Sequence, residues 1–502
     1  MLQELLQNQF GINLLKLESG LIMVKRNNEI FEIQQFIKAF QLSGRAENAE
    51  ICLDRLTAPI DELFLIERAK EIKTSYFSDK ETKRCLEQLA SICNKTEKKC
   101  TECPVNKYCN TFIGEARKRV NDNSLQMVDL FCGAGGLSLG FTQEGFVTAL
   151  ANDIQDVCVD TYAHNHPETP RNRIILGDIK QVVDDIDVLL TGKKIDIIVG
   201  GPPCQGFSMA NRQRLIDDPR NKLYKSFVEI VQKVHPPFFV MENVKGMLSV
   251  KDQVIEDFAS IGYTTQAQIL NAKDYGVPQN GERLIYIGNR VGVDNSEIFS
   301  RIIEASRNIP QTCLADALFG LRDLKPLRIK NATDLDTEES GRLIDHDNIN
   351  KQNYYVQYIN QGKKYPAVLN HKARYNNERD IEIFSRLHPG DKSTDPKIAD
   401  IMPYARRNDI FKDKYFKLEP DKVCKTITAH MKFDCNMYIH PFQARGLTPR
   451  EAARVQSYPD DYFFRGAYTK TYMQIGNSVP PLLGRTIASV LKSYMIKCKR
   501  LK

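Results

Sequence analysis

The central part of this 502-residue sequence predicts an α/β fold, a mostly parallel sheet with helices packed on it. Three observations predict it. Short apolar runs of strand length recur between residues 127 and 290. The first run leads into a glycine-rich loop and a helical pattern, and later runs end in an acidic residue or a cysteine. Because open sheets of this class bind ligands at the carboxyl ends of their strands, these residues predict a site along one sheet edge.

Length, charge and cysteine usage narrow the class of protein. A chain of this length exceeds what one core supports, so about two to four domains are expected. The net charge of +7, from 70 basic and 63 acidic residues, permits a nucleic-acid partner without requiring one. Neither a run of about 18 apolar residues nor a signal peptide is present, so a cytoplasmic protein is expected. In that reducing compartment the 13 cysteines indicate metal binding, catalysis or core packing.

Residues 1–124 predict an N-terminal helical domain that ends in a four-cysteine loop. Segments 30–42 and 59–72 place apolar residues three and four positions apart, which is typical of helices. The loop holds Cys93, Cys100, Cys103 and Cys109, with six, two and five residues between successive members. Four thiolates in so short a loop can hold either tetrahedral zinc or an iron–sulfur cluster.

The spacing of this loop, with the tripeptide ECP at residues 102–104, resembles the iron–sulfur loop of the endonuclease III and MutY family of DNA glycosylases. The resemblance covers only about residues 80–112. It implies a 4Fe–4S cluster but no glycosylase reaction, because the hairpin motif and the catalytic context of a glycosylase are not found. Zinc remains the alternative metal, since four cysteines alone do not select one.

The α/β part opens with an apolar strand, a glycine loop and a helical pattern at residues 127–141. Gly133, Gly135 and Gly136 would let the backbone approach a ligand while the amino end of the helix faces it. One loop of this kind is weak evidence for a nucleotide-type site. The two strands that follow strengthen the prediction.

Each of these two strands leads to an acidic residue. Asp153 follows the glycine loop by about twenty residues, where ribose hydroxyls are commonly bound, and Asp178 follows the third apolar run. Either acid alone would more often be a helix cap or turn residue. The glycine loop together with these two acids, each after a successive strand, instead predicts a nucleotide-type pocket.

Cys204 follows Pro202 and Pro203 at the end of a further apolar run. The stiff prolines would hold its thiol at the sheet edge, where it is well placed to be a nucleophile. A lone cysteine after a strand is more often a small buried hydrophobe, so the neighbouring groups decide its role. The next buried strand ends in Glu242, and a later one carries Arg283 at its start. A carboxyl beside the thiol could hydrogen-bond a heterocycle that the thiol attacks.

Six blocks of the sequence resemble, in order and spacing, the motifs of the DNA cytosine-5 methyltransferases. They are DLFCGAGG, GGPPCQGFS, MENVKG, VPQNGER, RGLTPREAARVQSYPDDY and QIGNSVPPLL. The resemblance covers about residues 127–290 and 441–492. One departure is Gly281, which stands where the family usually has an arginine, so one anchoring contact of the family lacks its residue here.

The resemblance implies a Rossmann-like methyltransferase domain that uses S-adenosylmethionine. This catalytic domain would span residues 125–292, a target-recognition domain 293–440, and C-terminal motifs 441–502 that return to the catalytic domain. The cofactor pocket implied by the resemblance comprises Phe131, Gly133, Gly135, Gly136, Asp153, Ile154, Asp178, Ile179, Pro202, Leu223, Asn477, Ser478 and Val479.

The resemblance also implies the reaction. Cys204 would add to carbon 6 of cytosine, Glu242 would hold or protonate ring nitrogen 3, and Arg283 would lie near oxygen 2, where negative charge develops. A base within a duplex cannot reach such a cleft, so it must be flipped out. The loop 208–220 would close over it, with Arg212 and Arg214 as candidates for phosphate contact.

The expected partner is double-stranded DNA, with a cognate restriction endonuclease as a further candidate. A nucleoid-associated monomer without membrane contact is expected. One alternative is a tRNA cytosine-5 methyltransferase of the same fold, although the long segment 293–440 argues for a duplex-reading surface. Another is a catalytically silent DNA-binding or redox-sensing homologue, against which the intact Cys204, Glu242 and Arg283 argue.

Overall fold

The computed structural model of the chain forms two compact units. The first comprises residues 1–119, 342–350 and 363–369, and the second 120–341, 351–362 and 370–502. The structure describes residues 13–16, 22–26, 29–31, 124–203, 223–330, 332, 335–345, 351–363, 365, 368–403, 414–433 and 435–500. No helix among these residues is long and apolar enough to cross a membrane.

The described N-terminal part of the first unit is a small antiparallel sheet. Its strands are β1 (Asn13–Lys16), β2 (Ile22–Arg26) and β3 (Glu29–Phe31), in that order. The helix predicted over residues 30–42 is therefore wrong at its first two positions. Two asparagines separate β2 from β3 in the sequence, and such residues favour a turn between strands rich in β-branched side chains. The other helices predicted here lie outside the described residues.

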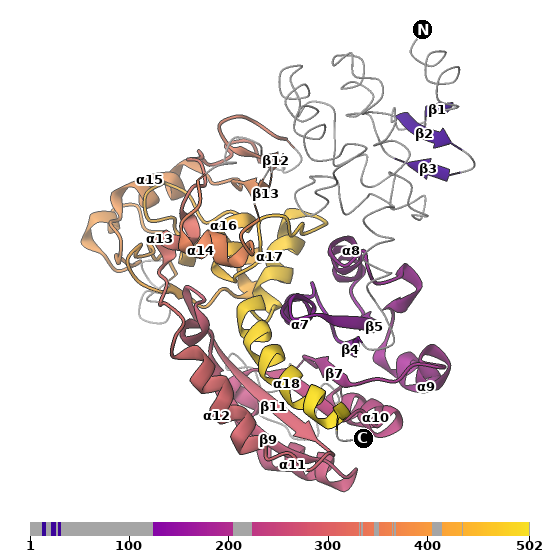
Figure 1. Ribbon diagram of the computed structural model, residues 1–502. Helices are drawn as coiled ribbons and strands as arrows, with labels where there is room; N and C mark the ends of the chain where they lie inside the picture. Colours follow the sequence, from indigo (N-terminus) through magenta and orange to yellow (C-terminus); the bar gives the residue numbers. More distant parts are fainter. Residues whose placement is uncertain are drawn as a thin grey trace. The chain divides into compact units, whose positions relative to one another are not determined.

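A seven-stranded sheet organises the second unit (Figure 1), with the order β6-β5-β4-β7-β8-β11-β9. The strands are β4 (Leu125–Leu130), β5 (Phe146–Asp153), β6 (Ile174–Leu176), β7 (Ile197–Gly200), β8 (Phe238–Asn243), β9 (Thr264–Asn271) and β11 (Glu282–Asn289). Neighbours from β6 to β8 are parallel, and β11 is antiparallel to both β8 and β9. The order reverses between β4 and β7, and such sheets bind ligands at the carboxyl ends of the strands at this point.

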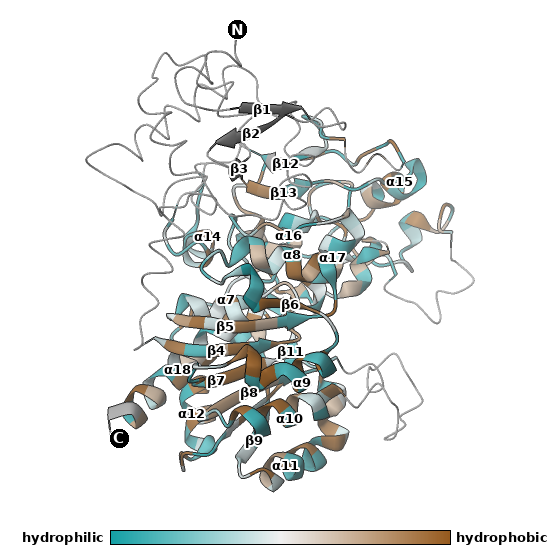
Figure 2. Cartoon of the chain, turned by 90° about the vertical axis from the view of Figure 1, so that its right-hand side faces the viewer, coloured by the Kyte–Doolittle hydropathy of each residue, from teal (hydrophilic) through white to brown (hydrophobic). Residues whose placement is uncertain are grey.

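Helices cover both faces of this sheet. One face packs against α7 (Gly136–Gln143), α12 (Asn295–Ser306) and α18 (Pro481–Arg500), the other against α9 (Ile179–Leu189), α10 (Leu223–Val234) and α11 (Lys251–Ser260). Along β8, Phe238 and Val240 join the first core while Phe239 and Met241 join the second. Figure 2 shows β7 and β8 as strongly hydrophobic strands. The predicted α/β fold is confirmed, and the structure adds that both faces of the sheet are covered.

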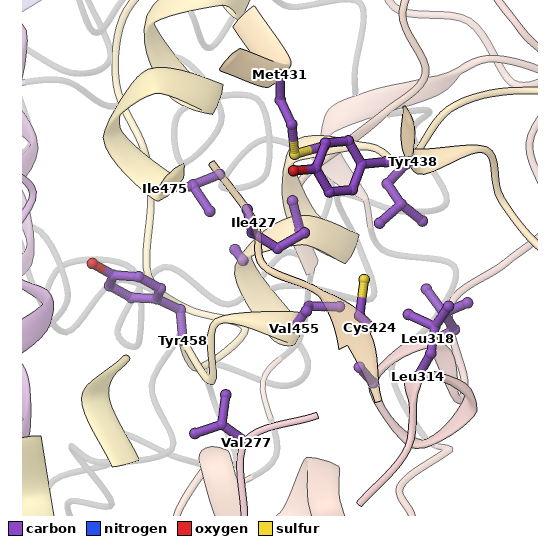
Figure 3. Close-up of a cluster of buried hydrophobic side chains, with 14 of the residues drawn as sticks. Val277, Leu314, Leu318, Cys424, Ile427, Met431, Tyr438, Val455, Tyr458 and Ile475 are labelled. Atoms are coloured by element: carbon purple, nitrogen blue, oxygen red, sulfur yellow. The ribbon is translucent and has the colours of Figure 1, made fainter. Parts of the chain in front are cut away.

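The remaining elements of the second unit include α8 (Asp156–Asn165), beside β5 and β6, and several short helices and strands. These are α13 (Leu314–Leu318), α14 (Tyr354–Ile359), α15 (Glu378–Arg386), α16 (Pro449–Val455), α17 (Tyr468–Asn477), β10 (Gln279–Asn280) and β14 (Cys424–Lys425). Two further strands, β12 (Gly341–Asp345) and β13 (Val368–Lys372), have residues in both units. Many of these short elements surround a third apolar core (Figure 3). Cys424 and Cys435 lie in this core.

The end of the chain returns to its glycine loop through direct contact of two helices. A Cβ atom placed on Gly140 of α7 would lie 2.4 Å from the backbone nitrogen of Arg485 and 2.5 Å from the carbonyl oxygen of Pro481. Only glycine permits this approach of α18 to α7. Residues near 480 are thereby held beside the first strand–loop–helix unit.

Candidate active site

The glycine loop joins β4 to α7 through left-handed backbone. Phe131 and Gly133 both have φ 54°, and Gly135 has φ 80°. Phe131 is not a glycine, so its conformation carries strain of the order of 1 kcal/mol, which is common at functional sites. A Cβ atom on Gly133 would meet nothing within 4 Å. The loop therefore presents open space on one side, as a ligand-binding loop requires.

Asp153 lies at the end of β5 and holds this loop in place. Its Oδ2 accepts a hydrogen bond of 2.8 Å from the backbone N–H of Gly133, and its Oδ1 accepts one of 2.8 Å from that of Gln155. Burial raises the pKa of this carboxyl, and the backbone donors oppose the increase. Next to it, Ile154 is 67% exposed, an apolar surface suited to the face of an aromatic ring.

Asp178 is the N-cap of α9, since its Oδ1 accepts a hydrogen bond of 3.0 Å from the backbone N–H of Lys180. Ile179 follows it and is buried. A helix cap was the alternative prediction for Asp178, and the structure shows that Asp178 caps α9. The cap fixes its carboxylate at the end of the third strand.

Ser478 and Val479 reach the glycine loop from the far end of the chain. A Cβ atom on Gly136 would lie 2.0 Å from Ser478 Oγ and 2.4 Å from the carbonyl oxygen of Val479. Asn477, the last residue of α17, is exposed beside them. The structure therefore brings the predicted C-terminal pocket residues to the loop.

Asp129, to which the sequence analysis assigned no role, lies buried in β4 just before the glycine loop. Its Oδ2 makes no hydrogen bond to any described residue. Burial raises the pKa of this carboxyl to about 7, and the charge of Asp153 adds to the increase. An acidic residue inside an otherwise apolar strand was the sequence signal that could have identified it.

Glu242 and Arg283 meet because β8 and β11 are antiparallel, which places the carboxyl end of one beside the amino end of the other. Arg283 Nε lies 3.0 Å from Glu242 Oε1, and the two side chains are only 12% and 13% exposed. Burial raises the pKa of Glu242, and the charge of Arg283 partly opposes the increase. The carboxyl therefore holds a proton to higher pH than an ordinary glutamate does.

The loop that leads to Cys204 lies against this pair. Asn243 Nδ2 donates a hydrogen bond of 2.9 Å to the carbonyl oxygen of Pro202. A Cβ atom on Gly201 would lie 2.9 Å from Glu242 Oε2. The sequence analysis assigned no role to Asn243, although it ends the same strand as Glu242.

Three predicted residues of this region, Cys204, Arg212 and Arg214, lie outside the described residues. Leu223 begins α10 and packs, partly buried, against the core of its sheet face. Gly281 donates its backbone N–H to Asn271 Oδ1 at 3.2 Å. A Cβ atom there would make only ordinary contacts of 3.5 Å or more, so a larger residue fits without disturbing the backbone.

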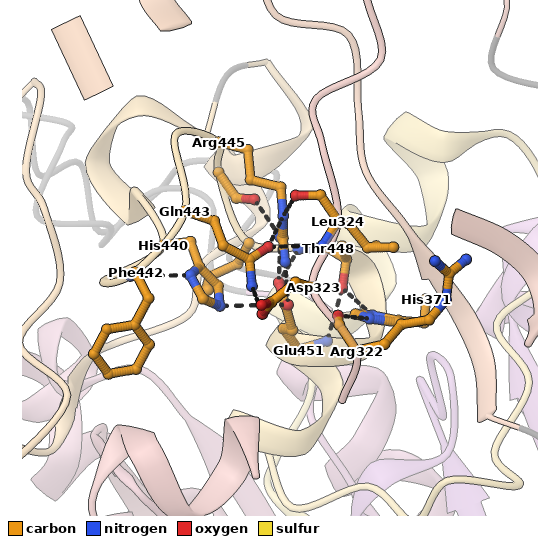
Figure 4. Close-up of polar contacts among 12 residues, drawn as sticks. Arg322, Asp323, Leu324, His371, His440, Phe442, Gln443, Arg445, Thr448 and Glu451 are labelled. Carbon is orange, nitrogen blue, oxygen red and sulfur yellow. Dashed lines mark hydrogen bonds and ion pairs between the residues drawn. The ribbon is translucent and has the colours of Figure 1, made fainter. Parts of the chain in front are cut away.

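A buried polar network ties residues 440–451 to the segment predicted to read DNA (Figure 4). Arg445 binds Glu451 through two hydrogen bonds of 2.8 and 2.7 Å. Burial opposes ionisation of Glu451, but Arg445 outweighs it and holds the pKa of that carboxyl well below its usual range. His371 contacts Thr448 Oγ1 at 3.2 Å and the carbonyl oxygen of Arg322 at 3.1 Å.

Within the described ranges, no three His, Cys, Asp or Glu side chains gather closely enough to hold a metal ion. Cys93, Cys100, Cys103 and Cys109 all lie outside those ranges, so their metal site stays a prediction.

The reversed-order sheet, the glycine loop and the buried acid–arginine pair define a Rossmann-like methyltransferase. Residues 125–493 match the family described as C-5 cytosine-specific DNA methylase. The chain belongs to this family, and it is a DNA cytosine-5 methyltransferase that uses S-adenosylmethionine.

Individual relatives match about three quarters of this chain. The Type II methyltransferase M.DdeI of Desulfomicrobium norvegicum is 34% identical over 398 residues, which cover 74% of this chain and 89% of that one. M.AgeI of Thalassovita gelatinovora, also a Type II methyltransferase, is 30% identical over 442 residues, 73% of this chain and 99% of that one. The crystal structure of a prophage-encoded E. coli protein, assigned as a DNA modification methyltransferase, superimposes with a TM-score of 0.57 at 26% identity and covers 74% and 99% of the two chains.

Proposed function

We propose that this enzyme methylates cytosine within a specific double-stranded sequence, through a covalent bond from Cys204 to a flipped-out base. The observation that supports this most directly is the Glu242–Arg283 pair, which lies against Gly201 and Pro202. Carbon 5 of cytosine is a weak nucleophile while the ring is aromatic. A thiolate that adds to carbon 6 removes this obstacle.

Glu242 and Arg283 would stabilise the base during this addition. A carboxyl that keeps its proton can donate a hydrogen bond to ring nitrogen 3 and pass the proton to it as the thiolate adds. The guanidinium of Arg283 would compensate the negative charge that grows on oxygen 2. Because both groups are buried and bound to each other before substrate arrives, little reorganisation is needed.

The cofactor pocket proposed here uses the residues around the glycine loop. S-adenosylmethionine supplies an electrophilic methyl group when bound. The open face of Gly133 leaves room for it, which supports the fit. Phe131, Gly133, Gly135 and Gly136 would receive its methionine part, Asp153 with Ile154 its ribose, and Asp178 with Ile179 its adenine. Pro202, Leu223, Asn477, Ser478 and Val479 would complete the walls.

We assign target recognition to residues 293–440, between the catalytic part 125–292 and the returning motifs 441–502. The polar network of Arg445 supports this, because its hydrogen bonds connect the returning motifs to Arg322 and His371 of the proposed recognition segment. Two relatives are named Type II methyltransferases, which supports a restriction–modification role with a cognate endonuclease. A tRNA substrate is not favoured, since the matching family and these relatives are DNA methyltransferases.

Bisulfite sequencing tests the proposal. DNA from cells that express the protein is expected to keep unconverted cytosines at one short sequence, and DNA from cells with an empty vector is not. Unconverted cytosines spread over unrelated sequences would contradict sequence-specific recognition. Methylation confined to RNA would favour the tRNA alternative.

We also propose that Cys93, Cys100, Cys103 and Cys109 hold a structural 4Fe–4S cluster, on the strength of their spacing. Protein purified without oxygen should be brown and contain about four irons per chain. Cys100→Ser should lose the colour while methyl transfer persists, because the proposed reacting residues lie elsewhere in the sequence. Colourless protein with one zinc per chain would show that the metal is zinc instead.

A further inference from the structure

An exposed aromatic side chain stands on a firmly held turn of the second unit. Phe433 is 63% exposed, directly after the short helix η10 (Ala429–Lys432). Single exposed apolar residues are common on protein surfaces, so exposure alone indicates nothing. The rigidity of the turn, its charged neighbours and its position are what indicate a function.

The backbone of the turn up to Phe433 is held by a side chain from another segment. Arg374 donates hydrogen bonds of 3.2 Å and 3.0 Å to the carbonyl oxygens of Met431 and Phe433. Met431 is completely buried, and Figure 3 shows it near Ile475 and Ile427 in the third core. A side chain presented on so rigid a turn loses little conformational entropy when it binds a partner.

The neighbours of Phe433 give the turn a character suited to nucleic acid. Lys432 Nζ lies 4.9 Å from the centre of the Phe433 ring, and the exposed His430 ring meets the same ring edge-on at 5.1 Å. Proteins that bind DNA strands combine cations for phosphates with aromatic rings for bases. We call His430, Lys432 and Phe433 the 430–433 tip.

The tip is packed against the helix that leads into the active site. A Cβ atom on Gly476 of α17 would lie 2.1 Å from the backbone nitrogen of Ala429, so the turn rests directly on that helix. Two residues after Gly476, the carbonyl oxygen of Ser478 accepts a hydrogen bond of 3.4 Å from Arg283.

A second set of contacts connects the segment before the tip to residues near β11 of the sheet. Ile427 donates its backbone N–H to Gln279 Oε1 at 2.8 Å, and β14 pairs in parallel with β10. Gln279 belongs to β10, just before β11 in the chain, and Arg283 belongs to β11. The segment that precedes the 430–433 tip is therefore hydrogen-bonded to β10, the strand just before the one that carries Arg283.

We propose that Phe433 stacks on a base of the duplex beside the flipped cytosine, while Lys432 contacts the adjoining phosphate. This inference rests on the proposed function, because it assumes a duplex at Glu242 and Arg283. Flipping costs a few kcal/mol of lost stacking, and an aromatic side chain that enters the stack offsets part of this. Phe433 is thus a positioning residue for the methyl transfer.

The test compares Phe433→Ala, Phe433→Tyr and Phe442→Ala in the full chain, with unmethylated plasmid DNA as the substrate. Phe442 is the matched control, because it is 66% exposed yet lies outside the tip. Stacking of one base on an aromatic residue predicts that Phe433→Ala lowers kcat/KM for DNA by about 5- to 100-fold. Phe433→Tyr should stay within about threefold of the wild type, since tyrosine offers the same stacking face. Phe442→Ala should match the wild type.

Two further measurements distinguish stacking from other roles. The dependence of DNA affinity on salt should have the same slope in Phe433→Ala as in the wild type, because no phosphate contact is lost. The midpoint of thermal unfolding should also be unchanged. The inference is overturned if Phe433→Ala keeps kcat/KM within twofold of the wild-type value. It is also overturned if Phe433→Tyr or Phe442→Ala lowers kcat/KM as much as Phe433→Ala does. A wild type that does not methylate plasmid DNA would overturn the proposed function itself.

Discussion

Replacement of Cys204 by alanine is expected to lower methyl transfer by at least about 10³-fold, because without the thiol no covalent bond activates the cytosine ring. Cofactor binding should be unchanged, since the glycine loop, Asp153 and Ser478 are untouched. Transfer of labelled methyl groups to plasmid DNA measures the rate of methyl transfer, and calorimetric titration with S-adenosylmethionine measures cofactor binding.

A matched control and a direct test of the bond accompany this variant. Cys313→Ala removes a partly exposed thiol elsewhere in the chain, at the N-cap of α13, and should keep methyl transfer. DNA that contains 5-fluorocytosine should form a stable adduct with the wild type, because fluorine cannot leave carbon 5 as a proton does. Methyl transfer by Cys204→Ala at the wild-type rate would contradict the thiol mechanism.

The Glu242→Gln variant should lower the single-turnover rate of methyl transfer by about 10²- to 10³-fold, the usual contribution of a general acid. Glutamine keeps the size of the side chain and an oxygen for Arg283 Nε, so the fold should persist. It cannot, however, pass a proton to ring nitrogen 3. Glu282→Gln is the control, since that neighbouring carboxylate is half-exposed and pairs with Lys245 at 2.9 Å.

The same pair of variants should differ in pH dependence. The pKa of Glu242 is raised, so its protonated form persists to higher pH than in an ordinary glutamate. Activity that requires this form is present below the raised pKa and is lost as the pH increases through it. The wild type and Glu282→Gln should show this decline with increasing pH, and Glu242→Gln should not. An identical decline in Glu242→Gln would assign it to another group.

Local pattern in the sequence was sufficient to predict the parallel strands and their polar ends, and β5, β7 and β8 lie where the apolar runs indicated. It could not predict that β11 inserts antiparallel between β8 and β9, because strand order depends on contacts distant in sequence. That insertion is what brings Arg283 to Glu242. The family resemblance predicted that Arg283 belongs to the active site, which the periodicity of the sequence alone could not predict.

Other features depended on packing that no local pattern reveals. The need for glycine at 136 and 476 follows from backbone contacts with residues far along the chain or in another element. The acid at position 129 stands out in an apolar strand, but the sequence does not reveal that Asp129 Oδ2 accepts no hydrogen bond from the described residues. Near the amino end, the strand preference of β-branched residues outweighed the helical spacing that begins at Ile30.

The contact of Ser478 and Val479 with Gly136 bears on how the protein is made. A chain leaves the ribosome from its amino end, so the strands that carry Asp153 and Glu242 are available long before residue 478 appears. One wall of the proposed cofactor pocket is therefore missing until residues 478 and 479 have been synthesised. A product terminated prematurely before α17 would keep the strands that carry Asp153, Glu242 and Arg283 and yet lack the wall that Ser478 and Val479 provide.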